Sequence, residues 1–209
     1  MKQILCFGDS NTFGLIPGTD KRYPWGVRWT SILNMDLGLD KFRVIEEGLC
    51  GRTTVFDDVL RDGRRGTELL PTLLESHQLL DLVIIMLGTN DCKTRNAASA
   101  DVIGKGITRI LDQVEQKADT KNVLLISPIH LGDKVWEEGY DEEFSEESVA
   151  ISKELAEVYR KIAKERKVAF LDASRYAAPS SKDREHMDEA GHLAFAKAVE
   201  EKIYELGIA

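Results

Sequence analysis

The six residues LVIIML at positions 82–87 constrain the fold of this chain more than any other stretch. A strand with this sequence is apolar on both faces, and such strands occur where helices cover both sides of a sheet. Four further short apolar stretches accompany it, and we expect strands at 3–7, 43–46, 82–87, 122–127 and 168–171. The central run therefore predicts a sheet buried between two layers.

Amphipathic stretches separate these strands. Apolar residues recur at helical spacing, with charges on the opposite face, and helices are expected at 27–37, 67–80, 100–118, 146–166 and 190–206. The regular alternation of strand and helix predicts a parallel, doubly wound α/β sheet with right-handed crossovers. With 209 residues and no repeat or linker, we expect a single domain over 1–209.

The charge balance narrows the function classes. The formal net charge is −8, which disfavours binding to nucleic acid. No apolar run reaches the length of a membrane span, and Gly8-Asp9-Ser10 interrupts the first apolar stretch where a signal peptide would continue. Three cysteines form neither a paired framework nor a CxxC motif. A cytoplasmic protein without contact to membranes or nucleic acid is expected.

Polar residues gather just after the predicted strands. Ser10 follows the first strand, Gly51 the second and Asn90 the third, while Asp183 and His186 come after the fifth. Binding sites of open α/β sheets form beyond the carboxyl ends of the strands. These five residues are therefore expected at one edge of the sheet.

Together they supply the groups that acyl transfer requires. Ser10, at a strand-to-helix turn, is the candidate nucleophile, and His186 is the candidate base. Asp183 lies three residues before His186, close enough to hold one ring nitrogen while the other faces Ser10. The backbone N–H groups of Ser10 and Gly51 and the amide of Asn90 are candidate donors to an oxyanion. Gly48 is the alternative to Gly51.

Four ordered blocks, GDSNTFG, EEGLCGRTT, GTND and DREHMDEAGH, resemble those of the SGNH hydrolases, also called GDSL esterases, and the resemblance spans nearly the whole chain. It implies a three-layer α/β/α flavodoxin-like fold with a five-stranded parallel sheet. It also implies that Ser10, Asp183 and His186 are catalytic and that Ser10, Gly51 and Asn90 form the oxyanion hole. Neither a metal nor an organic cofactor is expected.

The sequence is most similar to the arylesterase and acyltransferase branch of that family. This branch implies a small-molecule substrate, namely a short-chain aryl or alkyl ester, hydrolysed or used to acylate an alcohol, and it implies homo-oligomers. Two residues depart from the branch pattern: Asn11 stands where an apolar residue is common, and Arg184 where glycine is common. Both departures are expected to alter the shape of the pocket.

Two alternatives stay open at this point. A carbohydrate O-acetyl deacetylase or a thioesterase would use the same catalytic residues, because the pocket rather than the triad selects the leaving group. A non-catalytic α/β binding module is the alternative of a different class. The four complete blocks favour an enzyme over such a module.

Other reactive side chains have simpler interpretations. His192 follows Asp188, a good N-cap, and is expected to be structural on the last helix. His130 is interpreted as a loop residue, and Cys50 and Cys92 as small packed residues rather than nucleophiles. No histidine, cysteine or carboxylate spacing is typical of a metal site.

One acidic segment interrupts the alternation of strand and helix. Residues 131–148 hold eight carboxylates and one lysine, with three aromatic residues at four-residue intervals. This segment is either a solvated loop whose aromatic residues pack on the body, or a lid that faces the substrate. We further expect three tryptophans of loops and rims to pack between subunits: Trp25, Trp29 and Trp136.

Overall fold

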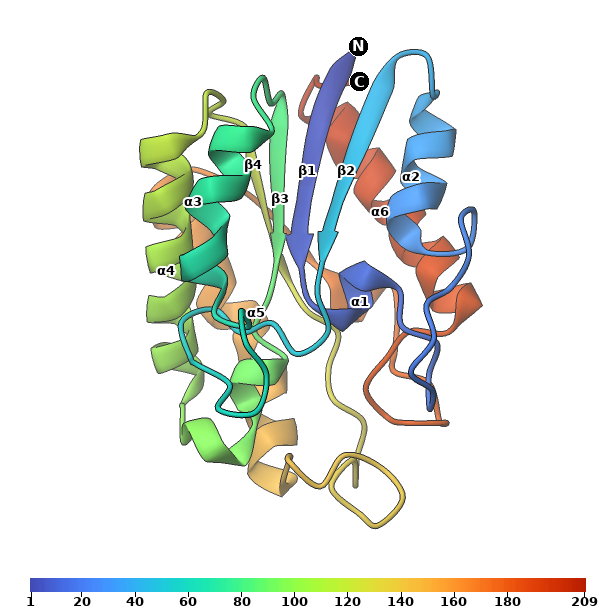
Figure 1. Ribbon diagram of the computed structural model, residues 1–209, viewed down its shortest axis with the longest axis vertical. Helices are drawn as coiled ribbons and strands as arrows, with labels where there is room; N and C mark the ends of the chain where they lie inside the picture. The colour runs from blue at the N-terminus through green and yellow to red at the C-terminus, as the bar shows by residue number, and fades with distance from the viewer.

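Five parallel strands form the central sheet of the computed structural model, which describes residues 1–209 (Figure 1). Their order across the sheet is β2-β1-β3-β4-β5, with every neighbouring pair parallel. This arrangement confirms the predicted parallel α/β fold. The strands are β1 (Lys2–Gly8), β2 (Phe42–Gly48), β3 (Leu82–Met86), β4 (Val123–Ser127) and β5 (Ala169–Asp172).

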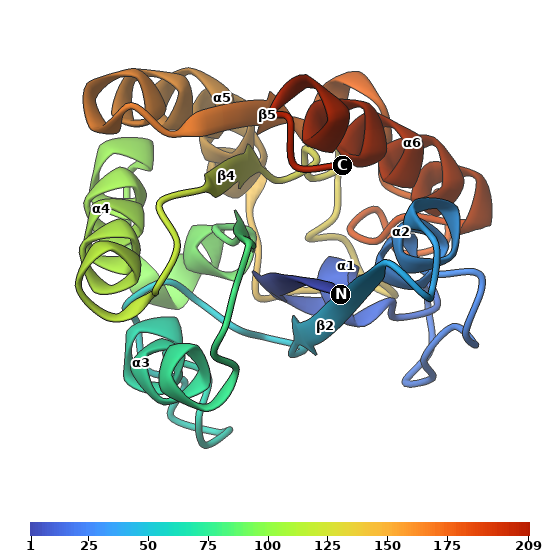
Figure 2. The same ribbon diagram turned by 90° about the horizontal axis from the view of Figure 1, so that it is seen from above.

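Helices cover both faces of this sheet. Figure 2 shows α3, α4 and α5 on one side and α2 and α6 on the other, so that the molecule has three layers. The α-helices are α1 (Ser10–Phe13), α2 (Trp29–Leu37), α3 (Gly66–Ser76), α4 (Ala100–Lys117), α5 (Glu146–Arg166) and α6 (Glu189–Glu205). Three short 3₁₀ helices complete the chain: η1 (Asn90–Cys92), η2 (Thr94–Asn96) and η3 (Ala173–Arg175).

The position of β3 between two buried clusters explains why its sequence is apolar throughout. Val83 and Ile85 belong to the buried cluster beneath α3, α4 and α5, whereas Ile84 and Met86 belong to the cluster beneath α2 and α6. Successive side chains of a strand point to opposite faces, so each core receives every second residue. The expected burial between two layers is confirmed.

The predicted helix at 67–80 is too long. In the structure α3 ends at Ser76. Beyond it the chain turns toward the start of β3, where Gln3 donates to the Leu79 carbonyl and the Leu80 N–H donates to Asp119. These contacts use backbone groups that a longer helix would need for its own hydrogen bonds. The apolar pattern alone does not show this, so the predicted helix extends too far.

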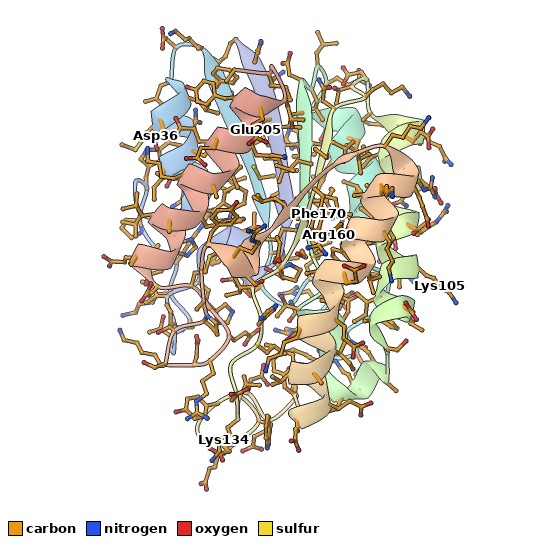
Figure 3. All side chains as sticks on the ribbon, turned by 180° about the vertical axis from the view of Figure 1, so that it is seen from behind. Asp36, Lys105, Lys134, Arg160, Phe170 and Glu205 are labelled. Atoms are coloured by element: carbon orange, nitrogen blue, oxygen red, sulfur yellow. The ribbon has the colours of Figure 1, made fainter.

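The two ends of the chain lie together at the amino end of the sheet (Figure 1). The ammonium of Lys2 donates to the carbonyl of Ile208 at 2.5 Å. The labelled Glu205 and Asp36 mark this end in Figure 3, and Lys134 marks the opposite end, beyond the carboxyl ends of the strands. None of the helices combines the length and the apolar character needed to cross a membrane.

Candidate active site

Ser10 lies just beyond the end of strand β1, which is an inner strand of the sheet. Asp9 is the N-cap of α1 and accepts a hydrogen bond from the Asn11 N–H at 3.0 Å. This cap ends the strand and makes Ser10 the first residue of the short helix. The side chain of Ser10 is only 3% exposed, so its hydroxyl is held in a largely water-excluded position at the carboxyl edge of the sheet.

His186 reaches Ser10 from the loop between η3 and α6. The Nε2 of His186 lies 2.8 Å from the Oγ of Ser10, and its Nδ1 lies 2.8 Å from Oδ2 of Asp183. An ionised carboxylate only accepts hydrogen bonds, so Nδ1 carries the proton and Nε2 accepts from the hydroxyl. The structure thus brings together the three residues in the order that proton removal from Ser10 requires.

Asp183 is fixed by backbone donors. Its Oδ1 accepts the N–H groups of Glu185 and His186, both at 3.0 Å, and its Oδ2 also accepts the N–H of Gly18 at 2.9 Å. Burial alone would raise the pKa of Asp183, but the hydrogen bond and the positive charge of His186 lower it. The carboxylate therefore stays ionised and holds the ring in one orientation.

The imidazole of His186 is more basic than usual. Its burial favours the neutral ring, but the negative charge of Glu185 and the hydrogen bond and charge of Asp183 outweigh burial and raise the pKa of His186 to about 9. The Oε1 of Glu185 lies 3.7 Å from Nε2. A strong base is the consequence, and it is free to accept a proton only when the ring is neutral.

Three donors come from the ends of the adjacent strands β1, β2 and β3. The N–H groups of Ser10 and Gly51 donate to no acceptor within the protein. The amide of Asn90 donates at 3.1 Å to the carbonyl of Arg52. A primary amide has two N–H bonds, so this contact orients Asn90 and leaves a second donor. The arrangement fits an oxyanion hole.

Gly48 and Gly51 occupy different environments. A Cβ on Gly48 would lie 2.1 Å from the backbone N of Phe13, so this glycine allows β2 to pass α1 closely. Gly51 lies in the loop after β2 with a φ of +82°, a conformation that favours glycine. Packing accounts for Gly48, whereas the Gly51 N–H has no acceptor within the protein, so Gly51 stays the preferred candidate donor.

Buried polar side chains support this edge of the sheet, and the sequence did not predict them. The guanidinium of Arg52 donates to the carbonyls of Gly8, at 2.9 Å, and Glu47. The carboxyl of Asp91 accepts from both the N–H and the hydroxyl of Thr54. These bonds tie the loops after β1, β2 and β3 to one another. Nothing in the sequence distinguishes Arg52 as a buried arginine, although it lies beside Gly51 in the EEGLCGRTT block.

Asn11 connects the nucleophile to the histidine loop. Its Oδ1 accepts the N–H of Met187 at 2.9 Å, and its Nδ2 donates to the carbonyl of Glu185 at 3.4 Å. These two backbone groups flank His186 on either side. Asn11, which departs from the branch pattern, therefore holds His186 next to Ser10. The sequence indicated only that the residue after the serine is unusual.

Arg184, the second departure, fastens the acidic segment 131–148 to the same loop. Its guanidinium donates to the carbonyls of Asp133 and Lys134, at 3.0 and 3.1 Å, and lies 4.1 Å from the ring centre of Tyr140. Its backbone has a φ of +62°, where glycine is favoured. The segment also binds the loop after β3 through Lys93, which pairs with carboxylates of the segment.

The remaining reactive side chains lie elsewhere. His192 is buried on α6, where its Nδ1 accepts the Trp29 N–H at 3.3 Å, and burial lowers its pKa to about 4. His130 is half-buried after β4 with no hydrogen bond from its ring. Burial raises the pKa of the Cys50 thiol to about 11, which disfavours a thiolate nucleophile.

The tryptophans do not share one environment. Trp29 is fully buried and packs edge-on against Phe195 at 5.2 Å, so the expectation that it lies on a rim between subunits is wrong. The helix α2 begins at this residue and turns it into the core. Trp136 packs against the other core cluster, and Trp25 is 51% exposed. Self-association stays a prediction, and Trp25 and the partly buried Trp136 remain available for it.

No group of three or more His, Cys, Asp or Glu side chains is arranged to hold a metal ion. Some buried polar side-chain atoms have no hydrogen-bond partner, among them Oδ2 of Asp9 and Nε of Arg52. The chemistry that this arrangement can perform is attack by an activated hydroxyl on a carbonyl carbon.

Comparison with known proteins identifies a family and similar solved structures. The pattern of the GDSL-like lipase/acylhydrolase family matches residues 6–194. A Mycobacterium smegmatis aryl esterase is 36% identical with a TM-score of 0.89, over 99% of this chain and 100% of that one. A carbohydrate acetylesterase from Sinorhizobium meliloti is 34% identical with a TM-score of 0.90, over 99% and 100%. Among curated protein sequences, none matches the chain.

Proposed function

The chain belongs to the GDSL-like lipase/acylhydrolase family and is a carboxylic ester hydrolase, and from this premise we propose that it cleaves short-chain acyl esters through Ser10, His186 and Asp183. The observation that carries the proposal is the continuous hydrogen-bonded row from the hydroxyl to the imidazole to the carboxylate, with 2.8 Å at each step.

In the first step, the Oγ of Ser10 attacks the ester carbonyl carbon while the hydroxyl proton moves to Nε2 of His186. The resulting oxyanion accepts hydrogen bonds from the N–H groups of Ser10 and Gly51 and from the amide of Asn90. When the intermediate collapses, the bond from carbon to the alcohol oxygen breaks. The departing oxygen takes the proton from Nε2, which leaves an acyl group on Ser10.

In the second step, water attacks the acyl carbon and gives its proton to Nε2. The bond to Oγ then breaks, and Oγ recovers the proton from His186. An alcohol that replaces water in this step receives the acyl group instead, so the same residues support acyl transfer. Each oxyanion donor lowers the barrier by roughly 3 kcal/mol.

A second candidate substrate class is acetylated carbohydrate. A structural neighbour that is 34% identical to this chain over 99% of its length is a carbohydrate acetylesterase. The triad acts on the carbonyl and is indifferent to the alcohol, so the pocket decides between an aryl ester and a sugar ester. A panel of p-nitrophenyl esters, acetylated xylosides and acyl-CoA separates these classes and tests a thioesterase as well.

The decisive experiment compares wild type with Ser10→Ala on p-nitrophenyl acetate. The variant is expected to lose at least about 10⁴-fold in kcat because no other hydroxyl faces His186. Ser31→Ala is the control, since Ser31 is a buried serine on α2 that bonds only to local backbone. A folded Ser10→Ala protein with most of the wild-type rate, or a wild type that a fluorophosphonate does not label at Ser10, would overturn the assignment.

A further inference from the structure

A pocket of about 440 Å³ opens beside the triad between the histidine loop, the acidic segment and the loop after α1. Its charged side chains are Asp20, Asp141, Lys182, Asp183, Glu185 and His186. Carboxylates outnumber cationic groups in this wall. The pocket is therefore a negatively charged space that borders Asp183 and His186 of the triad.

Glu185 differs from the other carboxylates of this pocket. Asp183 is compensated by His186, and Asp141 pairs with the ammonium of Lys93 at 3.2 Å. Asp20 is exposed to solvent. Glu185 is only 7% exposed, and its carboxylate accepts no hydrogen bond. A carboxylate of such low exposure has lost most of its hydration, so a positive charge placed beside it is favourable.

The position of Glu185 indicates which half of an ester it meets. Its Oε1 lies 3.7 Å from Nε2 of His186. Nε2 must pass its proton to the departing alcohol oxygen, so the alcohol half of the substrate lies on this side of the ring. An ammonium group two carbon atoms beyond that oxygen would therefore approach the Glu185 carboxylate.

We propose that Glu185 binds a cationic group, an alkylammonium, on the alcohol half of the ester substrate. The inference rests on the proposed function, since it assumes that the triad cleaves the ester. A cation is favoured over a neutral hydroxyl because it compensates both the buried charge and the surplus of carboxylates around it. An alcohol with the same charge would be guided to the acyl-enzyme in the transfer reaction.

The charges around Glu185 come from three segments. His186 and Asp183 lie on its own loop, Lys93 follows η1, and Asp141 belongs to the segment 131–148. Burial raises the pKa of Glu185, while the positive charges of His186 and Lys93 oppose this. When His186 becomes neutral, as catalysis requires, Glu185 loses its nearest cation. A substrate cation would then replace that charge.

The test uses two esters of the same shape that differ in charge, acetylcholine and 3,3-dimethylbutyl acetate. The wild type is expected to have a kcat/KM about tenfold higher for acetylcholine, since a charge pair of low exposure is worth that much. Glu185→Gln keeps the size of the side chain and is expected to bring the ratio of the two kcat/KM values close to one. Any common change in the base cancels in this ratio.

Asp133→Asn is the matched control, because it removes one carboxylate from the segment 131–148 at a position 84% exposed and outside the pocket. Its ratio is expected to equal that of wild type. The proposal is overturned if wild type shows no preference for acetylcholine, or if Glu185→Gln retains it. Failure of the proposed function differs, because neither ester would then depend on Ser10.

Discussion

The two halves of the catalytic site are built in different ways. The proposed nucleophile and oxyanion donors follow the ends of three adjacent strands, where Arg52 and Asp91 join the loops through buried hydrogen bonds. His186 is carried by a loop that comes after β5, at an edge of the sheet, and reaches Ser10 across 176 positions of sequence. Hydrogen bonds between loops, rather than strand pairing, hold that loop in place: the Gly132 N–H donates to the Arg184 carbonyl at 2.7 Å, and the side chains of Asn11 and Arg184 add further bonds.

This difference separates two sources of catalytic precision. Strand pairing sets the nucleophile half, so a substitution there removes one chemical group while the frame persists. Asn11 and Arg184 position the loop that carries His186. A substitution of either residue therefore leaves the imidazole present but displaces it from Ser10. The first kind of change is expected to act on the transition state, and the second on the distance between base and nucleophile.

After the loss predicted for Ser10→Ala, the largest effect is expected from another residue of the nucleophile half. Asn90→Ala removes an oxyanion donor, and kcat is expected to fall about 10²- to 10³-fold with little change in KM. Steady-state kinetics with p-nitrophenyl acetate measures both values. A loss below about fivefold would mean that the Asn90 amide does not meet the developing charge.

The raised pKa of His186 leads us to expect that kcat/KM depends on pH. His186 acts as a base only when neutral, and its pKa is raised to about 9. The kcat/KM is therefore expected to rise with pH, to be about a hundredfold lower at pH 7 than at its plateau, and to level off above the pKa. Rates are measured with the spontaneous hydrolysis subtracted. Glu185→Gln removes a negative charge next to the ring, so its midpoint is expected at lower pH; an unshifted midpoint would contradict this assignment.

Asn11→Leu tests the connection between the two halves. It removes both bonds to the histidine loop, and kcat is expected to fall about tenfold because the base is less well placed. Asn34→Leu is the matched control, since Asn34 likewise bonds one backbone carbonyl and one N–H, of Phe42 and Val44, but far from the triad. Both variants are expected to lower Tm. Equal kcat values for the two would show that Asn11 serves stability alone.

The smallest effect is expected for Arg184→Gly. Glycine favours the left-handed backbone at this position, which raises Tm. Loss of the guanidinium removes its bonds to the acidic segment, which lowers Tm, so the two effects partly offset each other. We expect KM to rise about threefold, with faster proteolysis within 131–148. Arg184→Lys keeps the charge without the planar group that donates to two carbonyls, and should behave in between. Unchanged proteolysis would show that other contacts hold the segment.

The comparison also explains what the sequence could predict. Strands and helices followed from periodicity, and the helix at 146–166 agrees with α5 because Ser145 and Ser148 form a capping box at its start. The triad residues could be proposed because Asp183 and His186 are near in sequence and follow a strand end. These signals come from residues that are close together in the chain, so they can be read directly from the sequence.

The supporting residues could not be predicted in the same way. Asn11 meets Glu185 and Met187, and Arg52 meets Gly8, through backbone groups that carry no residue-specific signature. Trp29 was placed wrongly because a large aromatic residue at a helix start gives no indication of which way the helix faces. Such contacts depend on how distant loops pack, which periodicity does not encode.

The meeting of the two chain ends at the amino end of the sheet has a practical consequence. A protein immobilised on a resin through either end would present its reacting groups to the bulk liquid. Joining Met1 to Ala209 with a short peptide would give a ring that can be reopened at an exposed loop remote from the triad, so circular permutation and fusion are routes by which this scaffold could be redesigned without disturbing its chemistry.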